Sequence, residues 1–424
     1  MWLFYFFAGL LVLQGLISLR GGLRYLAYFQ REMVRPLSDY TPFASVIVPC
    51  RGLDQGLREN LRALCVQVYP HYEIVFVLDS AHDPARIVID EVRAGATGGM
   101  IPTRIVIAGQ ATDCGQKVHS LRAGIGACDP ASEVFVFVDT DARPRCDWLR
   151  ALVAPLTDEG LGAATGYRWF VPDAGGFSAH LRAVWNASIA SALGPNEQQN
   201  FCWGGSTAIR RATFTRADVL ADWRGALSDD FALTRALQRA RLPIRFVPRC
   251  LTAAHEDCTF GELVEFTTRQ LKITRVYAPH LWQIVLVSNL LFVLIFYGGL
   301  ALVCARAWRG AQFIWPLALV AAIFTLGAAK ALLRLCAIAL PLATNGVRAR
   351  GATLLAHLCL WPLTSVLYAY NALAAGWSRR LTWRGITYEL RSPTETVVCT
   401  PAQATTTEEL ESAQLSDRKE QDNA

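Results

Sequence analysis

Three long apolar runs constrain the fold of this chain more than any other feature of its sequence. Residues 2–19 and 281–305 contain no charged side chain, and residues 352–375 contain no Asp, Glu, Lys or Arg and a single histidine, His357. A helix needs roughly 20 mostly apolar residues to cross the hydrocarbon core of a bilayer. The sequence therefore predicts a transmembrane anchor at residues 1–20 and a C-terminal transmembrane region at residues 281–376, with two to three spanning helices.

The direction of the first span follows from the basic residues around it. Arg20, Arg24, Arg31 and Arg35 come after the apolar run, and no basic residue precedes it. The positive-inside rule then places the N-terminus outside and the following domain in the cytoplasm. A cleavable signal peptide is the less favoured alternative, because it needs basic residues ahead of the run. Arginine far outnumbers lysine, a bias typical of GC-rich bacterial genomes, so the expected location is a bacterial inner membrane.

A fourth apolar stretch, residues 313–340, complicates this topology because it contains Lys330 and Arg334. Charges inside a span are costly. In addition, three full C-terminal spans would place the basic segment 378–385 outside, against the positive-inside rule. We therefore expect residues 313–340 to be re-entrant or interfacial.

The composition argues against two other kinds of protein. The net charge of +6 is modest, and no basic stripe interleaved with aromatic residues occurs, so we expect no nucleic-acid partner. The 12 cysteines show no CxxC pair and no zinc-like spacing. Scattered cysteines of this kind are typical of unpaired thiols in a reducing compartment.

The region between the first span and residue 281 has the pattern of an α/β domain, residues 40–280. Apolar strand-like segments alternate with helical periodicity, which predicts a mainly parallel sheet covered on both faces. Ligands of such sheets bind beyond the carboxyl ends of the strands. The expected strands are residues 44–49, 72–79, 103–109 and 133–141, and the expected helices include residues 56–67 and 117–128.

The segment VFVFVDTDARP, residues 134–144, places Asp139 and Asp141 at the end of one such strand. Two carboxylates at a strand end can hold Mg²⁺ or Mn²⁺, which take one or two protein carboxylates and complete their shell with phosphate oxygens and water. The alternative is that the pair only caps the following turn. Asp79 ends the neighbouring strand, so the three carboxylates are expected in one crevice.

Further acidic and basic groups follow along the chain. LSDDFALTRAL, residues 227–237, contains two adjacent aspartates, of which one can act as a general base; Ser228 or Asp229 can instead cap the helix. Arg269, Lys272 and Arg275 occupy one helical face just before a predicted span. They can bind lipid headgroups or a diphosphate.

Eight motifs taken in order resemble the inverting family 2 type glycosyltransferases with a GT-A (Rossmann-like) fold. The resemblance is closest to the ceramide glucosyltransferase branch and its bacterial lipid-glycosylating relatives, and it covers residues 1–391. The motifs are VIVPCRGLDQGLRENLRAL, YEIVFVLDSAHDPA, GQKVHSL, VFVDTDARP, WGGSTAIRR, SDDFAL, RQLKI and TWRGITYEL.

The resemblance implies a role for each matching residue. Asp230 is the implied catalytic base, and Asp141, together with Asp139, is implied to bind Mg²⁺ or Mn²⁺. The alignment leaves open whether Asp79 or Ser80 recognises the nucleotide base. The implied donor-binding residues are Pro49, Asp79, Lys117, Asp139 and Arg269, and the implied acceptor-binding residues are Trp203, Gly204, Gly205, Gln270 and Lys272.

One motif departs from the family pattern. The family has an Arg-Trp pair where this chain has Lys272 and Ile273. Lysine keeps the charge but loses the bidentate fork of arginine, and isoleucine removes an aromatic platform. The departure concerns the acceptor and leaves the donor residues intact.

The resemblance implies a membrane-bound enzyme that moves a hexose, glucose in the closest branch, from a UDP-sugar to a hydroxyl of a membrane lipid such as ceramide. The alternatives are a processive polysaccharide synthase and a non-catalytic membrane protein that binds a sugar nucleotide or lipid. Residues 377–391 are expected to be membrane-proximal. The polar tail, residues 392–424, is expected to be disordered.

Overall fold

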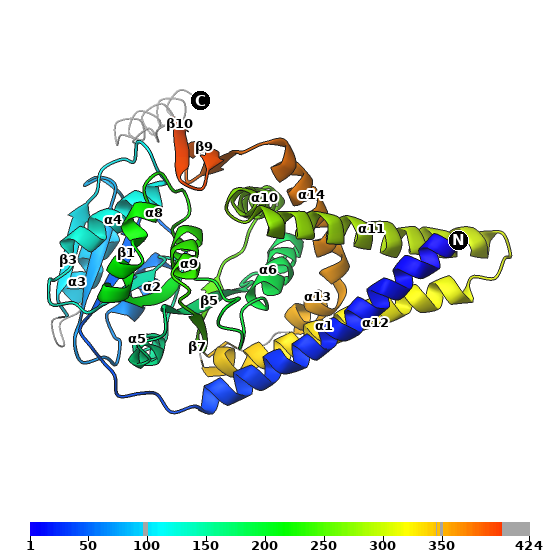
Figure 1. The fold of residues 1–424 in the computed structure, drawn as a ribbon, viewed down its shortest axis with the longest axis horizontal. Coiled ribbons are helices and arrows are strands. Elements are labelled where there is room, and N and C mark those ends of the chain that lie inside the picture. The colour runs from blue at the N-terminus through cyan, green and yellow to red at the C-terminus, as the bar shows by residue number, and fades with distance from the viewer. Residues whose placement is uncertain (96–100, 345, 348–350, 401–424) are drawn as a thin grey trace, which may run out of the picture.

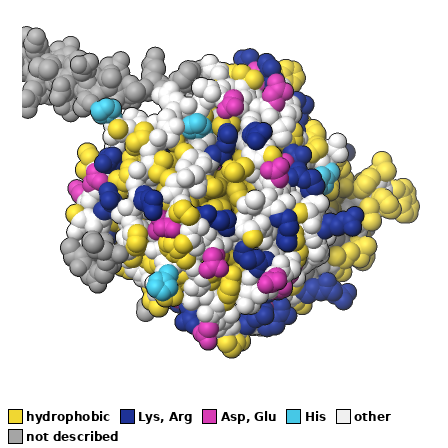
Figure 2. All heavy atoms as spheres, turned by 60° about the vertical axis from the view of Figure 1, so that its left-hand side comes forward, with side chains coloured by type: hydrophobic (Ala, Val, Ile, Leu, Met, Phe, Trp, Pro, Cys, Tyr) yellow, Lys and Arg dark blue, Asp and Glu magenta, His cyan; other side chains and the backbone are white. Residues whose placement is uncertain are grey.

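The computed structural model describes residues 1–95, 101–344, 346–347 and 351–400. An α/β domain forms one end of the molecule, and three long helices extend away from it (Figure 1). Figure 2 shows hydrophobic side chains covering the protruding helices, whereas charged side chains are spread over the α/β domain. An apolar surface on the protruding helices is what contact with lipid requires.

A seven-stranded sheet organises the α/β domain, with the order β3-β2-β1-β4-β6-β5-β7. Only β6 runs antiparallel to its neighbours, β4 and β5, and the other pairs are parallel. The predicted α/β class is therefore confirmed. The strands are β1 (Ala44–Cys50), β2 (Tyr72–Leu78), β3 (Thr103–Ile107), β4 (Val134–Val138), β5 (Ala163–Val171), β6 (Ser206–Arg210) and β7 (Ile244–His255).

Helices cover both faces of this sheet because alternate residues of each buried strand point to opposite sides. Val46 belongs to the hydrophobic core on the side of α2, α3 and α5. Its neighbour Ile47 belongs to the core on the side of α4 and α9. The helices of this domain, together with a 3₁₀ turn, are α2 (Leu57–Leu64), α3 (Ala85–Gly95), α4 (Gln116–Ala127), α5 (Trp148–Val153), η1 (Ala154–Thr157), α6 (Phe177–Ala190), α7 (Arg211–Arg216), α8 (Val219–Asp222), α9 (Asp229–Arg239) and α10 (Phe260–Tyr277).

In the described part of the chain, three helices are long and apolar enough to cross a membrane: α1 (Trp2–Val34), α11 (Pro279–Trp308) and α12 (Ile314–Thr344). The N-terminus and the turn between α11 and α12 lie together, far from the α/β domain (Figure 1). Helix α1 is longer than the predicted anchor, and its last turns pack on the sheet. There the Tyr28 hydroxyl donates to the Phe246 carbonyl at 2.5 Å.

The structure has no re-entrant segment at residues 313–340, where we expected one. Residues 314–344 form the continuous helix α12, whereas α13 (Gly351–Cys359) and α14 (Trp361–Trp377) meet at a bend of 60°. Pro362 stands in the first turn of α14, and proline lacks the N–H that would continue the preceding helix. Helix α12 tolerates Lys330 and Arg334 because both side chains line an internal cavity.

The C-terminal part of the described chain is an antiparallel sheet of β8 (Arg380–Trp383), β9 (Ile386–Ser392) and β10 (Glu395–Thr400). The prediction of disorder from residue 392 is therefore wrong for its first residues, because β-branched residues there pair with β9. Residues 401–424 lie outside the described part of the chain. Tyr388 of β9 is buried, and its hydroxyl accepts from the backbone N–H of Gln116 at 3.3 Å. Residues 377–391 thus pack on the α/β domain.

Candidate active site

One cavity of about 1240 Å³ lies at the carboxyl ends of the central strands and continues between the membrane helices. Its α/β part is rich in carboxylates, and its membrane part is lined by side chains of α1, α11, α12, α13 and α14. The carboxylates that line it are Asp54, Asp79, Asp139, Asp141, Asp229, Asp230, Glu256, Asp257, Glu262 and Glu265.

Lys117, in the first turn of α4, joins two of these carboxylates. Its Nζ lies 2.6 Å from Asp139 Oδ1, just beyond β4, and 3.3 Å from Asp229 Oδ2, at the start of α9. Burial alone lowers the pKa of Lys117, but the aspartates around it raise that pKa above its ordinary value, so the ammonium keeps its charge. Burial raises the pKa of Asp229 to about 7 despite Lys117. The predicted residues Lys117 and Asp139 are thus in direct contact.

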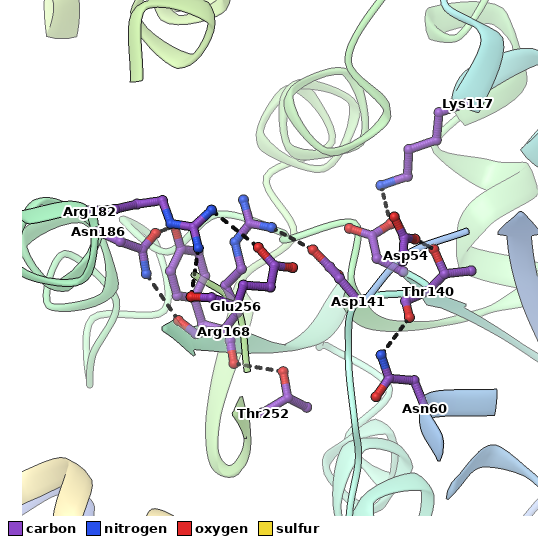
Figure 3. Close-up of polar contacts among 12 residues, drawn as sticks. Asp54, Asn60, Lys117, Thr140, Asp141, Arg168, Arg182, Asn186, Thr252 and Glu256 are labelled. Carbon is purple, nitrogen blue, oxygen red and sulfur yellow. Dashed lines mark hydrogen bonds and ion pairs between the residues drawn. The ribbon is translucent and has the colours of Figure 1, made fainter. Parts of the chain in front are cut away.

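Asp141 turns away from Lys117 toward Arg168 of β5 (Figure 3), and its Oδ2 accepts from the guanidinium at 2.9 Å. The other carboxylate oxygen, Oδ1, is buried without a hydrogen-bond partner among the described residues. Burial raises the pKa of Asp141 to about 7, and Arg168 opposes the shift. An unsatisfied buried oxygen is costly, so this oxygen is free to bind a donor or a cation.

These residues fit a divalent cation held jointly with a diphosphate. Within the described ranges no group of three or more His, Cys, Asp and Glu side chains is arranged to hold a metal. Mg²⁺, however, is usually bound through one or two carboxylates plus substrate phosphates. Asp139 and the unpaired oxygen of Asp141 supply that number of oxygen ligands.

Asp230 lies beside this group, in the first turn of α9, and lines the cavity. Ser228, not Asp229, is the N-cap of the helix, and its hydroxyl donates to Asp230 Oδ1. The same oxygen accepts from the Phe231 N–H at 2.7 Å. In the described chain Asp230 forms no ion pair, whereas Asp229 is paired with Lys117.

The predicted donor residues at the start of the domain also line the cavity. Pro49 lies in β1 and Asp79 follows β2. Arg51 Nη1 lies 2.9 Å from Asp79 Oδ2. Burial raises the pKa of Asp79, and Arg51 opposes the shift.

The predicted acceptor residues divide into two groups. Trp203 and Gln270 line the cavity, and Trp203 also packs on Tyr167 with ring centroids 5.4 Å apart. Gly204 and Gly205 do not line it. A Cβ on Gly204 would lie 2.1 Å from Asp229 Oδ2, and one on Gly205 would lie 2.3 Å from the Trp203 ring. In the structure these glycines make room for neighbouring side chains, and their role at the acceptor mouth stays a prediction.

Lys272, another predicted acceptor residue, does not face the cavity. Its ammonium donates to the Arg380 carbonyl at the start of β8. On α10 its neighbours Leu271 and Ile273 are buried in two different hydrophobic cores. Lys272 lies about 100° around the helix from each of them and reaches the small C-terminal sheet.

An aromatic side chain that sequence reasoning missed stands beside Arg269. The guanidinium carbon of Arg269 lies 5.5 Å from the ring centroid of Trp383, which follows it by more than a hundred residues. Burial lowers the pKa of Arg269 to about 10. The family pattern has an aromatic residue where this chain has Ile273. Trp383 places an aromatic ring at the cavity instead. The motif TWRGITYEL contains Trp383, but its place in the sequence gives no sign of this contact.

Two arginines were missed as well. Arg384, the residue after Trp383, donates to Asp54 Oδ1 at 2.6 Å and joins the small sheet to the donor side of the cavity. Arg168 holds Asp141, as described above. Ion pairs formed between distant segments leave no signal in a single sequence.

The fold and this site define a glycosyltransferase of the GT-A type that carries membrane helices. The chain belongs to glycosyl transferase family 21, whose model matches residues 10–396. The relationship to glycosyltransferases predicted from the motifs is confirmed, and the matching family is family 21.

Two solved structures illustrate what the fold is similar to. A mannosyltransferase of Pyrobaculum calidifontis, in complex with GDP-mannose and Mn²⁺, is 18% identical with a TM-score of 0.47; the match covers 88% of this chain and 99% of that one. Glucosyl-3-phosphoglycerate synthase of Mycobacterium tuberculosis, in complex with phosphoglyceric acid, is 16% identical with a TM-score of 0.36. That match covers 59% of this chain and 82% of the other.

Proposed function

We propose that this glycosyltransferase moves a hexose, glucose by family resemblance, from a UDP-sugar to a hydroxyl of a membrane lipid such as ceramide, with inversion at the anomeric carbon. The observation that carries the proposal is the continuity of the cavity. The same cavity is lined by Asp230 and by side chains of the spanning helices, such as Leu11 of α1 and Phe292 of α11. A lipid can therefore enter from the bilayer and bring a hydroxyl to the carboxylates.

The residues divide into a base and a donor-binding group. Asp230 takes the proton from the acceptor hydroxyl, which attacks the anomeric carbon from the side opposite the nucleotide. General bases of this kind contribute about 10²- to 10⁴-fold to the rate. Lys117 and Arg269 face the cavity as cations and stabilise the charge that develops on the departing diphosphate.

Asp139 and Asp141 would hold the Mg²⁺ or Mn²⁺ ion that joins the protein to the diphosphate. A bound divalent cation neutralises charge on the leaving group. Arg168 keeps the Asp141 carboxylate in position for this role. Burial disfavours ionised Asp141, and a divalent cation compensates by favouring the ionised form.

We further propose that the protein lies in the cell membrane with its α/β domain in the cytoplasm. In this topology the membrane is crossed by α1, α11 and α12, and the bent pair of α13 and α14 stays on the inner side. Residues 378–385 then lie on the same side as the α/β domain. That topology satisfies the positive-inside rule for the arginines of this segment as well as for those that follow the first span.

The test is UDP release by detergent-purified full-length protein given UDP-glucose, Mg²⁺ or Mn²⁺ and a panel of membrane lipids. Lipid-stimulated release that is lost with EDTA, in Asp141→Asn and in Asp230→Asn is the expected result. Asp230→Asn is expected to keep metal-dependent UDP binding, because its charge is not needed for the donor. Metal-dependent UDP binding without release on any sugar or lipid would favour a non-catalytic binding protein instead.

A further inference from the structure

The membrane part of the cavity contains two basic residues for which the chain supplies no acidic partner nearby. Lys330 and Arg334 lie one turn apart on α12, and both line the cavity. The sequence has no Asp or Glu between Glu265 and Glu389, so helices α11 to α14 carry none. Among the described residues neither Lys330 nor Arg334 has a carboxylate within 4.0 Å, although ion pairs are numerous in the α/β domain.

Hydrogen-bond donors around these two cations are also unsatisfied. Arg334 is 9% exposed, and its buried Nε has no partner in the described chain. The same is true of both ring nitrogens of His357, which is 0% exposed, and of Trp361 Nε1. All three side chains line the cavity. Buried polar groups normally have partners, so Arg334 Nε–H, Trp361 Nε1–H and a ring N–H of His357 fit a ligand that supplies several acceptor oxygens.

The depth of the cations matches a lipid headgroup. Arg334 comes twenty residues after Ile314, the first residue of α12 at the end far from the α/β domain. Twenty residues of α-helix span about 30 Å, roughly the thickness of the hydrocarbon core. Arg334 therefore lies near the membrane surface on the side of the α/β domain, with Lys330 about one turn deeper.

We propose that Lys330 and Arg334 bind the anionic group, a phosphate or a carboxylate, of a membrane lipid inside the cavity. Ionisable residues within membrane segments are expensive and generally mark a functional site. This proposal rests on the membrane location given under the proposed function, and it does not depend on glycosyl transfer. The site is continuous with the active site, because His357 and Arg168, the residue that holds Asp141, line the same cavity.

The experiment compares lipid retention by native mass spectrometry of the full chain. The probes are phosphatidylglycerol and phosphatidylcholine with the same acyl chains. The variants are wild type, Lys330→Gln with Arg334→Gln, the charge-keeping Lys330→Arg with Arg334→Lys, and Arg309→Gln as a control. Arg309 follows α11 at the end far from the α/β domain and is exposed.

Wild type, the charge-keeping variant and the control are expected to retain phosphatidylglycerol about tenfold better than phosphatidylcholine. The double glutamine variant is expected to lose the preference while it still binds UDP, which shows that it is folded. Equal retention of both lipids by wild type, or an unchanged preference in the double glutamine variant, would overturn the proposal.

The same samples, incubated with UDP-glucose and Mn²⁺, separate this proposal from the proposed function. A hexose added to phosphatidylglycerol would make the anionic lipid an acceptor. A lipid that is retained but unmodified would make it a ligand that binds beside the acceptor. Both outcomes support the site. Absence of turnover with every lipid would refute only the transferase reaction, because retention is measured without it.

Discussion

Replacing Gly204 with alanine tests the role that the structure assigns to this glycine. The added Cβ would lie 2.1 Å from Asp229 Oδ2 and 2.7 Å from Lys117 Nζ, both too close for any real contact. The Asp229 side chain is only 6% exposed and cannot move into solvent. Either the backbone shifts, or the contact between Asp229 and Lys117 breaks.

The expected cost follows from these two possibilities. Overpacking of a core costs about 1–3 kcal/mol, and breaking a buried ion pair by displacing one partner costs about 3–5 kcal/mol. We expect Gly204→Ala to lose about 2–5 kcal/mol in the free energy of unfolding. For a domain of this size the loss corresponds to a melting temperature lower by roughly 5 °C or more.

The assay is thermal unfolding in detergent combined with metal-dependent UDP binding. Gly126→Ala is the matched control: Gly126 lies in α4, and a Cβ there would meet nothing within 4 Å. Alanine is favoured over glycine in helices by about 1 kcal/mol, so the control should be at least as stable as wild type. If Gly204→Ala instead melts like wild type, binds UDP normally and only raises the KM for the acceptor lipid, the packing argument is refuted and the glycine shapes the acceptor mouth.

Three further predictions concern single side chains. Trp383→Ala should weaken donor binding about twofold to thirtyfold, because it removes a cation–π contact of Arg269 worth about 0.5–2 kcal/mol; a UDP titration in which Trp383→Phe performs no better than alanine would exclude an aromatic role. Lys272→Gln should change UDP release less than about twofold, because the side chain points away from the cavity; a large loss in a steady-state assay would return it to the acceptor site. Burial raises the pKa of Asp229 to about 7, from an ordinary value of 3.8. The folded state therefore binds the extra proton between these values, and stability falls as pH rises through about 7. Melting curves of the ligand-free protein should show this fall, and an equally steep fall in Asp229→Asn would assign it to another group.

Much of the active site could be predicted because its residues follow directly from local patterns. The apolar run of β4 ends at Asp139 and Asp141, and parallel strands bring their carboxyl ends to one edge of the sheet. The same rule brings Asp79 to the cavity. The SDDFAL segment places Asp230 in the first helical turn, where Ser228 is the N-cap as local capping preferences allow.

The expectations that the structure does not match concern the direction of side chains and contacts between distant segments. Gly204 and Gly205 were expected at the mouth of the cavity, but the space they leave is filled by Asp229 and Trp203. The bend was expected at the charged stretch, but it occurs where proline interrupts the backbone, while the cavity accepts the charges of α12.

Local patterns in the chain are enough to predict the α/β class, the membrane helices and the acidic edge of the sheet, because periodicity, hydropathy and strand ends are local properties. Which charges meet depends on tertiary packing. Three features join segments that are far apart in sequence: the ion pair between Asp141 and Arg168, the stacking of Arg269 on Trp383, and the extension of the cavity to Lys330. Such contacts depend on how the sheet, the small C-terminal sheet and the membrane helices pack, and a single sequence carries no local record of that packing.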